Sequence, residues 1–236
     1  MTAPPTRSYL TSVQLKWLAM TTMFIDHLAA ALVQPVSLQT GLGSLSLGQS
    51  DQLVFLMRLI GRLAFPIFCF LLVEGFRYTR NRWAYARRLG LFALVSEIPF
   101  DLALHQQIFY WGGQNVYFTL FLAFLAMGLM TYFKDRSYLA GGSVVLLALL
   151  AELLATDYGA YGVVFVVLLH YYDQNRLRQL AMVALTGLAQ LTASLAVIPL
   201  ACYNGRKGRG NSKVFYLFYP VHLLVLAIIR YHLLGY

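Results

Sequence analysis

The stretch VQLKWLAMTTMFIDHLAAALV, from Val13 to Val33, decides the class of fold. It is apolar almost throughout and has the length of about 20 residues that a helix needs to cross a bilayer. A charged side chain at the centre of such a helix costs about 2.5 to 3.5 kcal/mol, yet Asp26 and His27 stand side by side near its middle. The pair therefore predicts a buried polar or chemical site.

The composition of the whole chain agrees with a membrane protein. Hydrophobic residues make up 59% of the chain, charged residues only 11%, and the mean hydropathy is +0.64. The connections between apolar runs are too short to hold a soluble domain. We predict an all-α, polytopic transmembrane helix bundle in which residues 1–236 form a single integral membrane domain.

Apolar runs bounded by glycine, proline and charge predict about eight membrane helices, one of them short or re-entrant. They are Val13–Val33, Leu53–Phe76, Trp83–Leu104, Val116–Phe133, Tyr138–Ala155, Tyr161–Tyr172, Leu177–Pro199 and Val214–Leu234. The sixth run has only about a dozen residues and is the short one.

Basic residues fall in alternate connections, and this pattern gives the orientation. The positive-inside rule puts the N-terminus on the cytoplasmic side of a membrane that the chain crosses several times. Connections 34–52, 105–115 and 156–160 contain no lysine or arginine and are expected on the other side. The basic ones carry Arg7 and Lys16, then Arg77, Arg80, Arg82, Arg87 and Arg88, then Lys134 and Arg136, then Arg176 and Arg178.

The last connection, residues 203–213, breaks this alternation, because it carries four positive charges where counting puts the outside. One explanation is that the seventh run, with Gly187 near its middle, is a hairpin that enters and returns on the cytoplasmic side. A second is an external anion-binding loop, since basic turns rich in glycine suit phosphate groups. A third is a solvated loop without a ligand.

Polar residues inside the apolar runs are expected to face inward and pair, arginines against carboxylates, around a polar cavity. Two sets have the i, i+4 spacing that puts side chains on one helix face. The residues are Arg58 and Arg62, Glu74, then Glu97, Asp101 and His105, and later Glu152, Asp157 and His222.

His27 is the candidate general base. A neutral imidazole can take a proton from an amine or hydroxyl, and a carboxylate beside it can fix its tautomer. Neighbouring residues on a helix point about 100° apart, so Asp26 pairs either with His27 or with an arginine such as Arg62. The alternative is a packing hydrogen bond without catalysis.

A series of short motifs, in order along nearly the whole chain, resembles the TraX family. The motifs are LK (15–16), MFIDH (23–27), GRLAFPIF (61–68), LVEGF (72–76), TRNR (79–82), SEIPF (96–100), NVYFTL (115–120), DYGAYG (157–162), YNGRKG (203–208) and FYPVHL (218–223). A more distant likeness, to membrane acyltransferases with a histidine in the first helix, implies the same chemistry.

The resemblance implies a protein of the bacterial inner membrane that transfers an acetyl group from cytoplasmic acetyl-CoA, as in acetylation of the N-terminal amine of conjugative pilin. His27 with Asp26 would be catalytic, and Asn115 or Tyr219 would stabilise the oxyanion. The acceptor, a pilin peptide, a glycan or a lipid, stays open. The donor phosphates would bind Arg77, Arg80, Arg82, Arg206 and Lys207, and the cavity would also contain Thr119, Asn204 and His222.

Two other functions remain open from the residues alone. Buried carboxylates and histidines also mark proton-coupled transporters, and a noncatalytic scaffold for envelope assembly would need none of them. Metal-ligand and nucleotide-binding motifs are absent from the sequence, so no metal is expected as a cofactor. The net charge of +9 is explained by topology rather than by nucleic acid, and the sequence does not give an oligomeric state.

Overall fold

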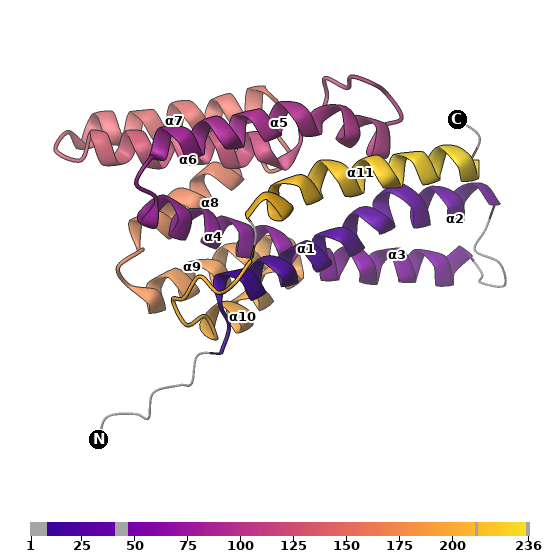
Figure 1. The fold of residues 1–236 in the computed structure, drawn as a ribbon, viewed down its shortest axis with the longest axis horizontal. Coiled ribbons are helices and arrows are strands. Elements are labelled where there is room, and N and C mark those ends of the chain that lie inside the picture. The colour runs from indigo at the N-terminus through magenta and orange to yellow at the C-terminus, as the bar shows by residue number, and fades with distance from the viewer. Residues whose placement is uncertain (1–8, 41–46, 211, 235–236) are drawn as a thin grey trace.

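A computed structural model describes residues 9–40, 47–210 and 212–234, and within these residues every regular element is a helix (Figure 1). The predicted all-α class is thus confirmed. The helices are α1 (Ser12–Leu28), a π-helical turn (Ala29–Val33), α2 (Gln34–Thr40), α3 (Leu47–Gly61), α4 (Ala64–Tyr78), α5 (Arg82–Leu104), α6 (Val116–Tyr132), α7 (Ser137–Leu153), α8 (Gly159–Tyr171), α9 (Arg176–Gly187), a 3-10 segment (Leu188–Ala196), α10 (Val197–Ala201) and α11 (Ser212–Leu234).

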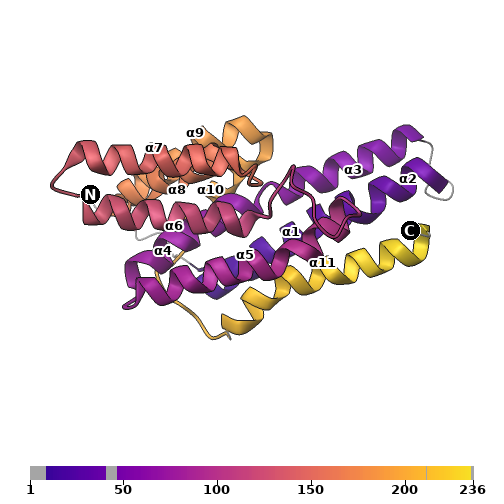
Figure 2. The ribbon, with the colours of Figure 1, turned by 90° about the horizontal axis from the view of Figure 1, so that it is seen from above.

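The long helices run roughly along one axis of the molecule in both ribbon views (Figures 1 and 2). Helix α5 packs between α6 and α11, and α1 packs against α3 and α4. Large, almost completely buried side chains pack between these helices, with Phe165 of α8 against Phe65 of α4, and Phe76 of α4 against Phe124 of α6. Burial of this apolar surface stabilises the packing of the helices against one another.

The first two predicted runs differ from the structure in their ends. The first helix does not stop at Val33 but continues through the π-helical turn to Thr40. The run Leu53–Phe76 is two helices, because α3 ends at Gly61 and α4 begins at Ala64. Pro66 has no N–H to donate to the preceding turn, and proline is tolerated in the first turn of a helix. The break between α3 and α4 therefore lies just before Pro66, whose missing N–H could not continue the hydrogen bonds of α3.

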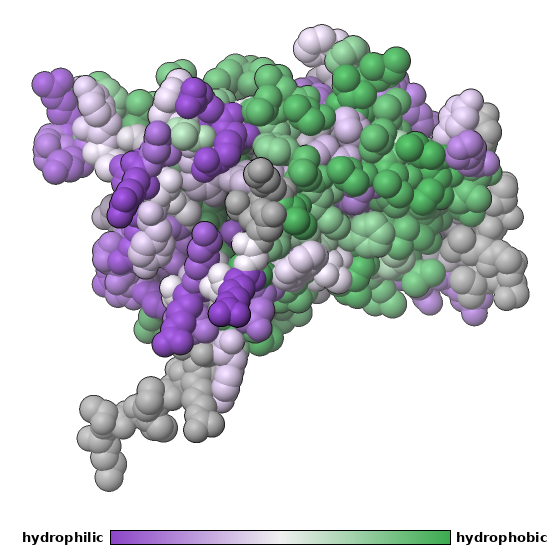
Figure 3. All heavy atoms as spheres, viewed as in Figure 1, coloured by the Kyte–Doolittle hydropathy of each residue, from purple (hydrophilic) through white to green (hydrophobic). Residues whose placement is uncertain are grey.

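Eight complete crossings are not confirmed. Within the described residues, two helical stretches are long and apolar enough to cross a membrane, Gly48–Tyr78 and Val214–Leu234. Four others, including α6, α7 and α8, are apolar but have fewer residues than a crossing of about 20 requires. Apolar side chains nevertheless cover much of the face that Figure 3 shows. The chain has the surface of a membrane protein, and the number of crossings stays a prediction.

The seventh predicted run, Leu177–Pro199, is a helical hairpin. Helix α9 leads in, and the 3-10 segment with α10 returns against it. At the bend, a Cβ on Gly187 would lie 2.4 Å from the backbone nitrogen of Ser194, so only glycine allows this close return. The guanidinium of Arg176 donates to the carbonyl of Leu200, which ties the entry of the hairpin to its exit. The hairpin offered as one explanation of the charge pattern is present.

The last basic connection lies against the start of α1. Leu10 and Tyr203 form a parallel backbone bridge, in which the N–H of Leu10 donates to the carbonyl of Cys202 at 2.9 Å and the N–H of Asn204 donates to the carbonyl of Leu10 at 2.8 Å. The next turn continues the contact, since the N–H of Ser12 donates to the carbonyl of Arg206 at 2.9 Å. The connection is therefore at the N-terminal end of α1 and not at the opposite end, where counting of separate crossings had put it.

All the described basic connections share one end of the bundle, on the left in Figure 1, where hydrophilic side chains gather in Figure 3. We call this the basic end: the start of α1 with residues 77–82, 133–137, 172–176 and 203–210. Arg7, residues 41–46 of the connection 34–52, and Asn211 lie outside the described residues, and the side chain of Lys213 does too.

Candidate functional site

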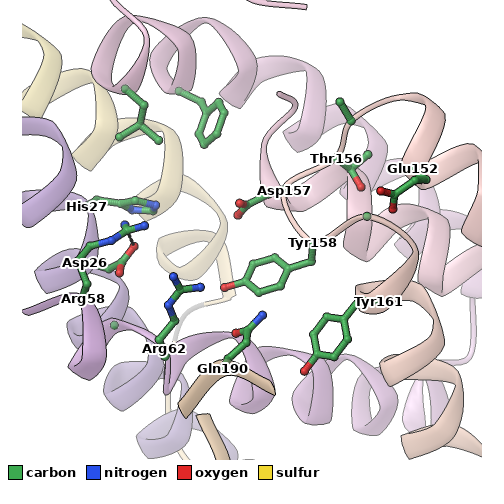
Figure 4. A pocket seen from close by; sticks show the side chains of 15 residues that line it. Asp26, His27, Arg58, Arg62, Glu152, Thr156, Asp157, Tyr158, Tyr161 and Gln190 are labelled. Atoms are coloured by element: carbon green, nitrogen blue, oxygen red, sulfur yellow. Dashed lines mark hydrogen bonds and ion pairs between the residues drawn. The ribbon is translucent and has the colours of Figure 1, made fainter. Parts of the chain in front are cut away.

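A polar cavity of about 500 Å³ separates α1 and α3 from the turn between α7 and α8 (Figure 4). The tip of the α9 hairpin closes it through Gln190, and the end of α5 closes it through Leu104. The charged and aromatic side chains on its walls are Asp26, His27, Arg58, Arg62, Phe100, Glu152, Asp157, Tyr158 and Tyr161. Residues far apart in the sequence thus meet in one place.

Asp26 pairs with Arg58, not with Arg62 or His27. The Arg58 Nη1 atom lies 2.6 Å from the Asp26 Oδ2 atom, and the two side chains are 37% and 19% exposed. The close approach of α3 to α1 depends on Gly61, where a Cβ would come within 2.3 Å of the Asp26 side chain. Of the two alternatives drawn from the sequence, pairing of Asp26 with an arginine is the one observed, and the arginine is Arg58 rather than the example Arg62.

His27 is buried and is held by the last helix. Its Nδ1 atom lies 2.8 Å from the Nε2 atom of His222, with the two rings stacked at 5.0 Å between centroids. The Nδ1 atom of His222 is 2.7 Å from the carbonyl oxygen of Phe218, one helical turn earlier. His222 was expected only as a cavity residue, and its contact with His27, across 195 positions, carries no signal in the sequence.

The opposite wall is the turn from Ala155 to Gly159, which α6 holds in place. Gln114 and this turn exchange backbone hydrogen bonds of 2.9 Å, and the Thr119 hydroxyl accepts from the N–H of Tyr158 at 3.4 Å. Gly159 has a φ of +48°, a left-handed conformation that glycine adopts without a Cβ penalty. Thr119 thus supports the cavity from behind rather than lining it.

Asp157 projects from this turn into the cavity (Figure 4). Removal from bulk water, with the negative charge of Asp26 nearby, raises the pKa of Asp157 to about 6, and the charges of Arg58 and Arg62 oppose the rise. The side chain is exposed to the space of the cavity. Its charge can therefore change close to neutral pH.

Arg62 extends into the cavity between Asp26 and Tyr158 (Figure 4). Within the described residues its guanidinium makes no hydrogen bond or close ion pair. The side-chain oxygen of Gln190 on the same wall is also without a hydrogen-bond partner in the described part of the chain. A buried polar group without a partner costs free energy, so this wall is suited to a polar ligand.

Several predicted site residues lie away from the cavity and bond within the protein. Glu74 accepts from the Tyr203 hydroxyl at 3.0 Å, and Asp101 accepts from the N–H of Tyr110 at 2.8 Å. Asn204 caps its own turn by accepting from the N–H of Arg206. The expected pairing of arginines with carboxylates therefore holds for Asp26 but not for these acids.

Asn115 and Tyr219 were the expected oxyanion donors. Both hydrogens of the Asn115 amide are engaged, since it donates to the Ala93 carbonyl and to Glu97, while its oxygen caps α6. No donor on this side chain is left for a substrate. Tyr219 is buried beside His27, at 5.7 Å between ring centroids, and it does not line the cavity.

The five basic residues expected to bind donor phosphates lie at the basic end. Arg77 donates to the backbone of Asp173 at 3.2 Å, and Arg82 stacks on Phe76 at 4.1 Å. Arg80, Arg206 and Lys207 are exposed. The run of α1 from Ser12 to Asp26 measures about 20 Å at 1.5 Å per residue, so the basic end and the cavity are separate places.

Among the described residues, no group of three or more histidine, cysteine or acidic side chains is placed to hold a metal ion. The ligands that the cavity offers are instead hydrogen-bonding and charged groups of both signs.

Comparison with known proteins places the chain in a family. The family model described as TraX protein matches residues 11–230. The chain belongs to the TraX family. This confirms the resemblance drawn from the motifs and agrees with the apolar helices of a membrane protein.

A curated relative of this TraX family chain is similar to it over nearly its full length. The relative is the probable fimbrial assembly protein FimC, serogroup H1, of Dichelobacter nodosus, which is 32% identical over 244 residues, covering 91% of this chain and 93% of the relative. No solved structure matches the chain.

Proposed function

We propose that this TraX family chain is a membrane-embedded acyltransferase that moves an acetyl group from acetyl-CoA to an amine or hydroxyl acceptor. The observation that carries the proposal is His27, a buried imidazole that borders a polar cavity and has one ring nitrogen engaged by His222. A base held in this way can remove a proton from a nucleophile in the cavity.

In the proposed reaction, His27 takes the proton from the acceptor as its nitrogen or oxygen attacks the thioester carbonyl. A new C–N or C–O bond forms, the C–S bond breaks, and the departing thiolate receives the proton from the imidazolium. Positioned general bases contribute about 10² to 10⁴ in rate. Arg62, which projects into the cavity without a hydrogen-bond partner in the described residues, takes the place of Asn115 as the group to stabilise the oxyanion.

The two substrates are proposed to approach from opposite ends. Exposed arginines at the basic end suit the phosphates of the donor, whose thioester arm would reach along the bundle to His27. The turn 155–159 belongs to the ends of α7 and α8 that lie away from the basic end, so the acceptor is proposed to enter there. The name of the curated relative favours a component of a pilus or fimbria as acceptor.

The first test is turnover of labelled acetyl-CoA by the protein in nanodiscs, with a fimbrial or pilin peptide and with amine and hydroxyl acceptors. We expect the wild type to transfer acetyl groups and His27→Ala to lose at least about 10²-fold in kcat while still binding the donor. His170→Ala is the control, because His170 is a half-buried histidine that lies away from the cavity, at the basic end, with its Nδ1 atom 3.8 Å from the Asp173 Oδ2 atom. Equal activity of wild type and His27→Ala would overturn the role of His27.

The donor site has its own test. Replacement of Arg77, Arg80 and Arg82 by glutamine should raise the Kd for acetyl-CoA by about tenfold or more, since each charge-assisted contact contributes about 1.5 to 3 kcal/mol. The control replaces Arg136 and Arg178, basic residues of other connections at the same end. An equal loss in both sets would mean that general charge attraction, and not a binding site, brings the donor to this end.

A proton-coupled transporter is the second candidate, favoured by Asp26, Asp157 and His27 around one cavity and by the contact of His27 with a second histidine, His222. It predicts proton flux into liposomes that His27→Ala abolishes, with no acetyl transfer. Turnover without flux favours the acyltransferase, and flux without turnover favours the transporter.

A further inference from the structure

The contact between His27 and His222 has a defined direction. The carbonyl oxygen of Phe218 can only accept a hydrogen bond, and it lies 2.7 Å from the Nδ1 atom of His222. His222 must therefore carry a proton on Nδ1. In a neutral imidazole the other nitrogen is then an acceptor, so Nε2 of His222 has a lone pair.

This lone pair fixes the state of His27. The Nε2 atom of His222 lies 2.8 Å from Nδ1 of His27, and an acceptor at that distance needs a donor opposite it. His27 consequently has its proton on Nδ1, and its own Nε2 is the nitrogen left with a lone pair. Since His27 borders the cavity, this is the nitrogen available to a substrate.

The charged groups around the pair do not provide another orienting partner. Asp26, on α1, gives its carboxylate to Arg58 from α3. Tyr219 on α11 faces His27 with its ring, and its hydroxyl has no partner in the described residues. In the described part of the chain, Asp157 and Glu97 make no hydrogen bond with either imidazole, and Glu97 accepts from Asn115 instead.

We propose that His222 is the positioning residue of this site, which holds His27 in the tautomer with a free Nε2 by accepting a hydrogen bond from Nδ1. The role is the one that a carboxylate has in serine hydrolases, where loss of the correct tautomer lowers kcat by about 10⁴. Here a neutral imidazole replaces the carboxylate, and the Phe218 carbonyl orients it in turn. The proposal rests on the proposed function for its kinetic consequences but not for its geometry.

Three substitutions at His222 separate positioning from packing. His222→Gln keeps an acceptor near the position of Nε2, His222→Leu removes it at similar volume, and His222→Glu supplies a charged acceptor. We expect kcat to fall at least about 10²-fold in the leucine variant and less than about tenfold in the glutamine variant. In His222→Glu the acidic limb of the pH–rate profile should move to higher pH, because a carboxylate stabilises the imidazolium.

A merely structural role gives a different result. The leucine variant would then lose yield or thermal stability, while kcat per folded molecule and the pH profile would match those of the wild type, and the proposal would be overturned. Double substitution with His27→Ala adds a check, since His222→Leu should have no further effect on rate once His27 is gone.

A direct readout keeps the inference testable if no acetyl transfer is found. In protein with ¹⁵N-labelled histidine, NMR in nanodiscs distinguishes the two tautomers of His27. We expect the Nδ1–H form in the wild type and in His222→Gln, and a mixture of tautomers in His222→Leu. The Nε2–H form in the wild type would overturn the positioning role, whereas absence of turnover with the expected tautomer would overturn only the proposed function.

Discussion

The basic end and the cavity use the same residue type in two ways. At the basic end, Arg77 donates to a backbone carbonyl and Arg82 stacks on an aromatic ring, so their charges stay exposed. In the cavity, Arg58 is bound to one carboxylate and Arg62 reaches toward the open space. At the basic end, the positive charge is thus a property of whole connections. In the cavity, the role of each arginine depends on the exact position of its guanidinium.

The largest effect is expected when the side of the membrane on which the basic end lies is tested by cysteine labelling. An introduced cysteine either reacts with an impermeant reagent added on a given side or does not react at all. In a chain with Cys69 and Cys202 replaced by alanine, Arg80→Cys and Arg209→Cys should react with an impermeant thiol reagent from one face of the membrane only. Trp111→Cys, in the exposed turn before α6, should react from the other face. Reaction of Arg209→Cys from the face of Trp111→Cys would contradict the hairpin and put this basic connection outside.

Gly61→Ala should damage the cavity through sterics alone. The new Cβ would lie 2.3 Å from the Asp26 side chain, and overpacking of this kind costs about 1 to 3 kcal/mol. We expect a clear drop in Tm and in turnover in the same detergent. Gly48→Ala, earlier in the same helix and with no atom within 4 Å, is the matched control and should change neither. Similar behaviour of the two variants would mean that α3 does not approach α1 as closely as described.

The pair Asp26 and Arg58 should be energetically coupled. A double-mutant cycle with alanine at both positions is expected to give about 0.5 to 3 kcal/mol, the range for residues in direct contact. The comparison cycle of Asp26 with Arg77 at the basic end should be additive within about 0.5 kcal/mol. Unfolding free energies of the four proteins in each cycle supply the measurement, and additivity of the Asp26 and Arg58 effects would remove the ion pair from the account.

The smallest effect is a pH dependence from Asp157. Because enclosure raises the pKa of this carboxyl to about 6, against about 3.9 in an unfolded chain, the folded state binds the proton more tightly between these values. Protonation of Asp157 therefore adds to the free energy of unfolding at low pH, and this contribution is lost as pH rises from about 4 to about 6. Asp157→Asn should be more stable than the wild type at pH 7.5, with a difference that shrinks toward pH 4. A difference in Tm that is constant across this range would show that Asp157 titrates normally.

The fold was predictable where hydrophobic runs are long and uninterrupted. The run from Val116 and the run from Val214 begin in the structure within two residues of the predicted positions, because polar caps and loop residues mark their starts. The break between α3 and α4 at Arg62–Leu63 was not predicted, because the residues on both sides of it are apolar and resemble one continuous membrane helix. The hairpin at Gly187 was predicted only as one of three explanations for the positive charges of the connection 203–213.

By itself the sequence determined that the protein is a helical membrane chain with an acid and a histidine inside its first helix, and it determined the family, because composition and local motifs are properties of contiguous residues. Only the tertiary structure decided that Arg58 binds Asp26, that His222 binds His27 and that Glu74 lies elsewhere. Partners such as these come from helices distant in sequence, and their choice depends on how closely two helices pack. A glycine at Gly61, with no Cβ, sets that distance, and no pattern of hydropathy records it.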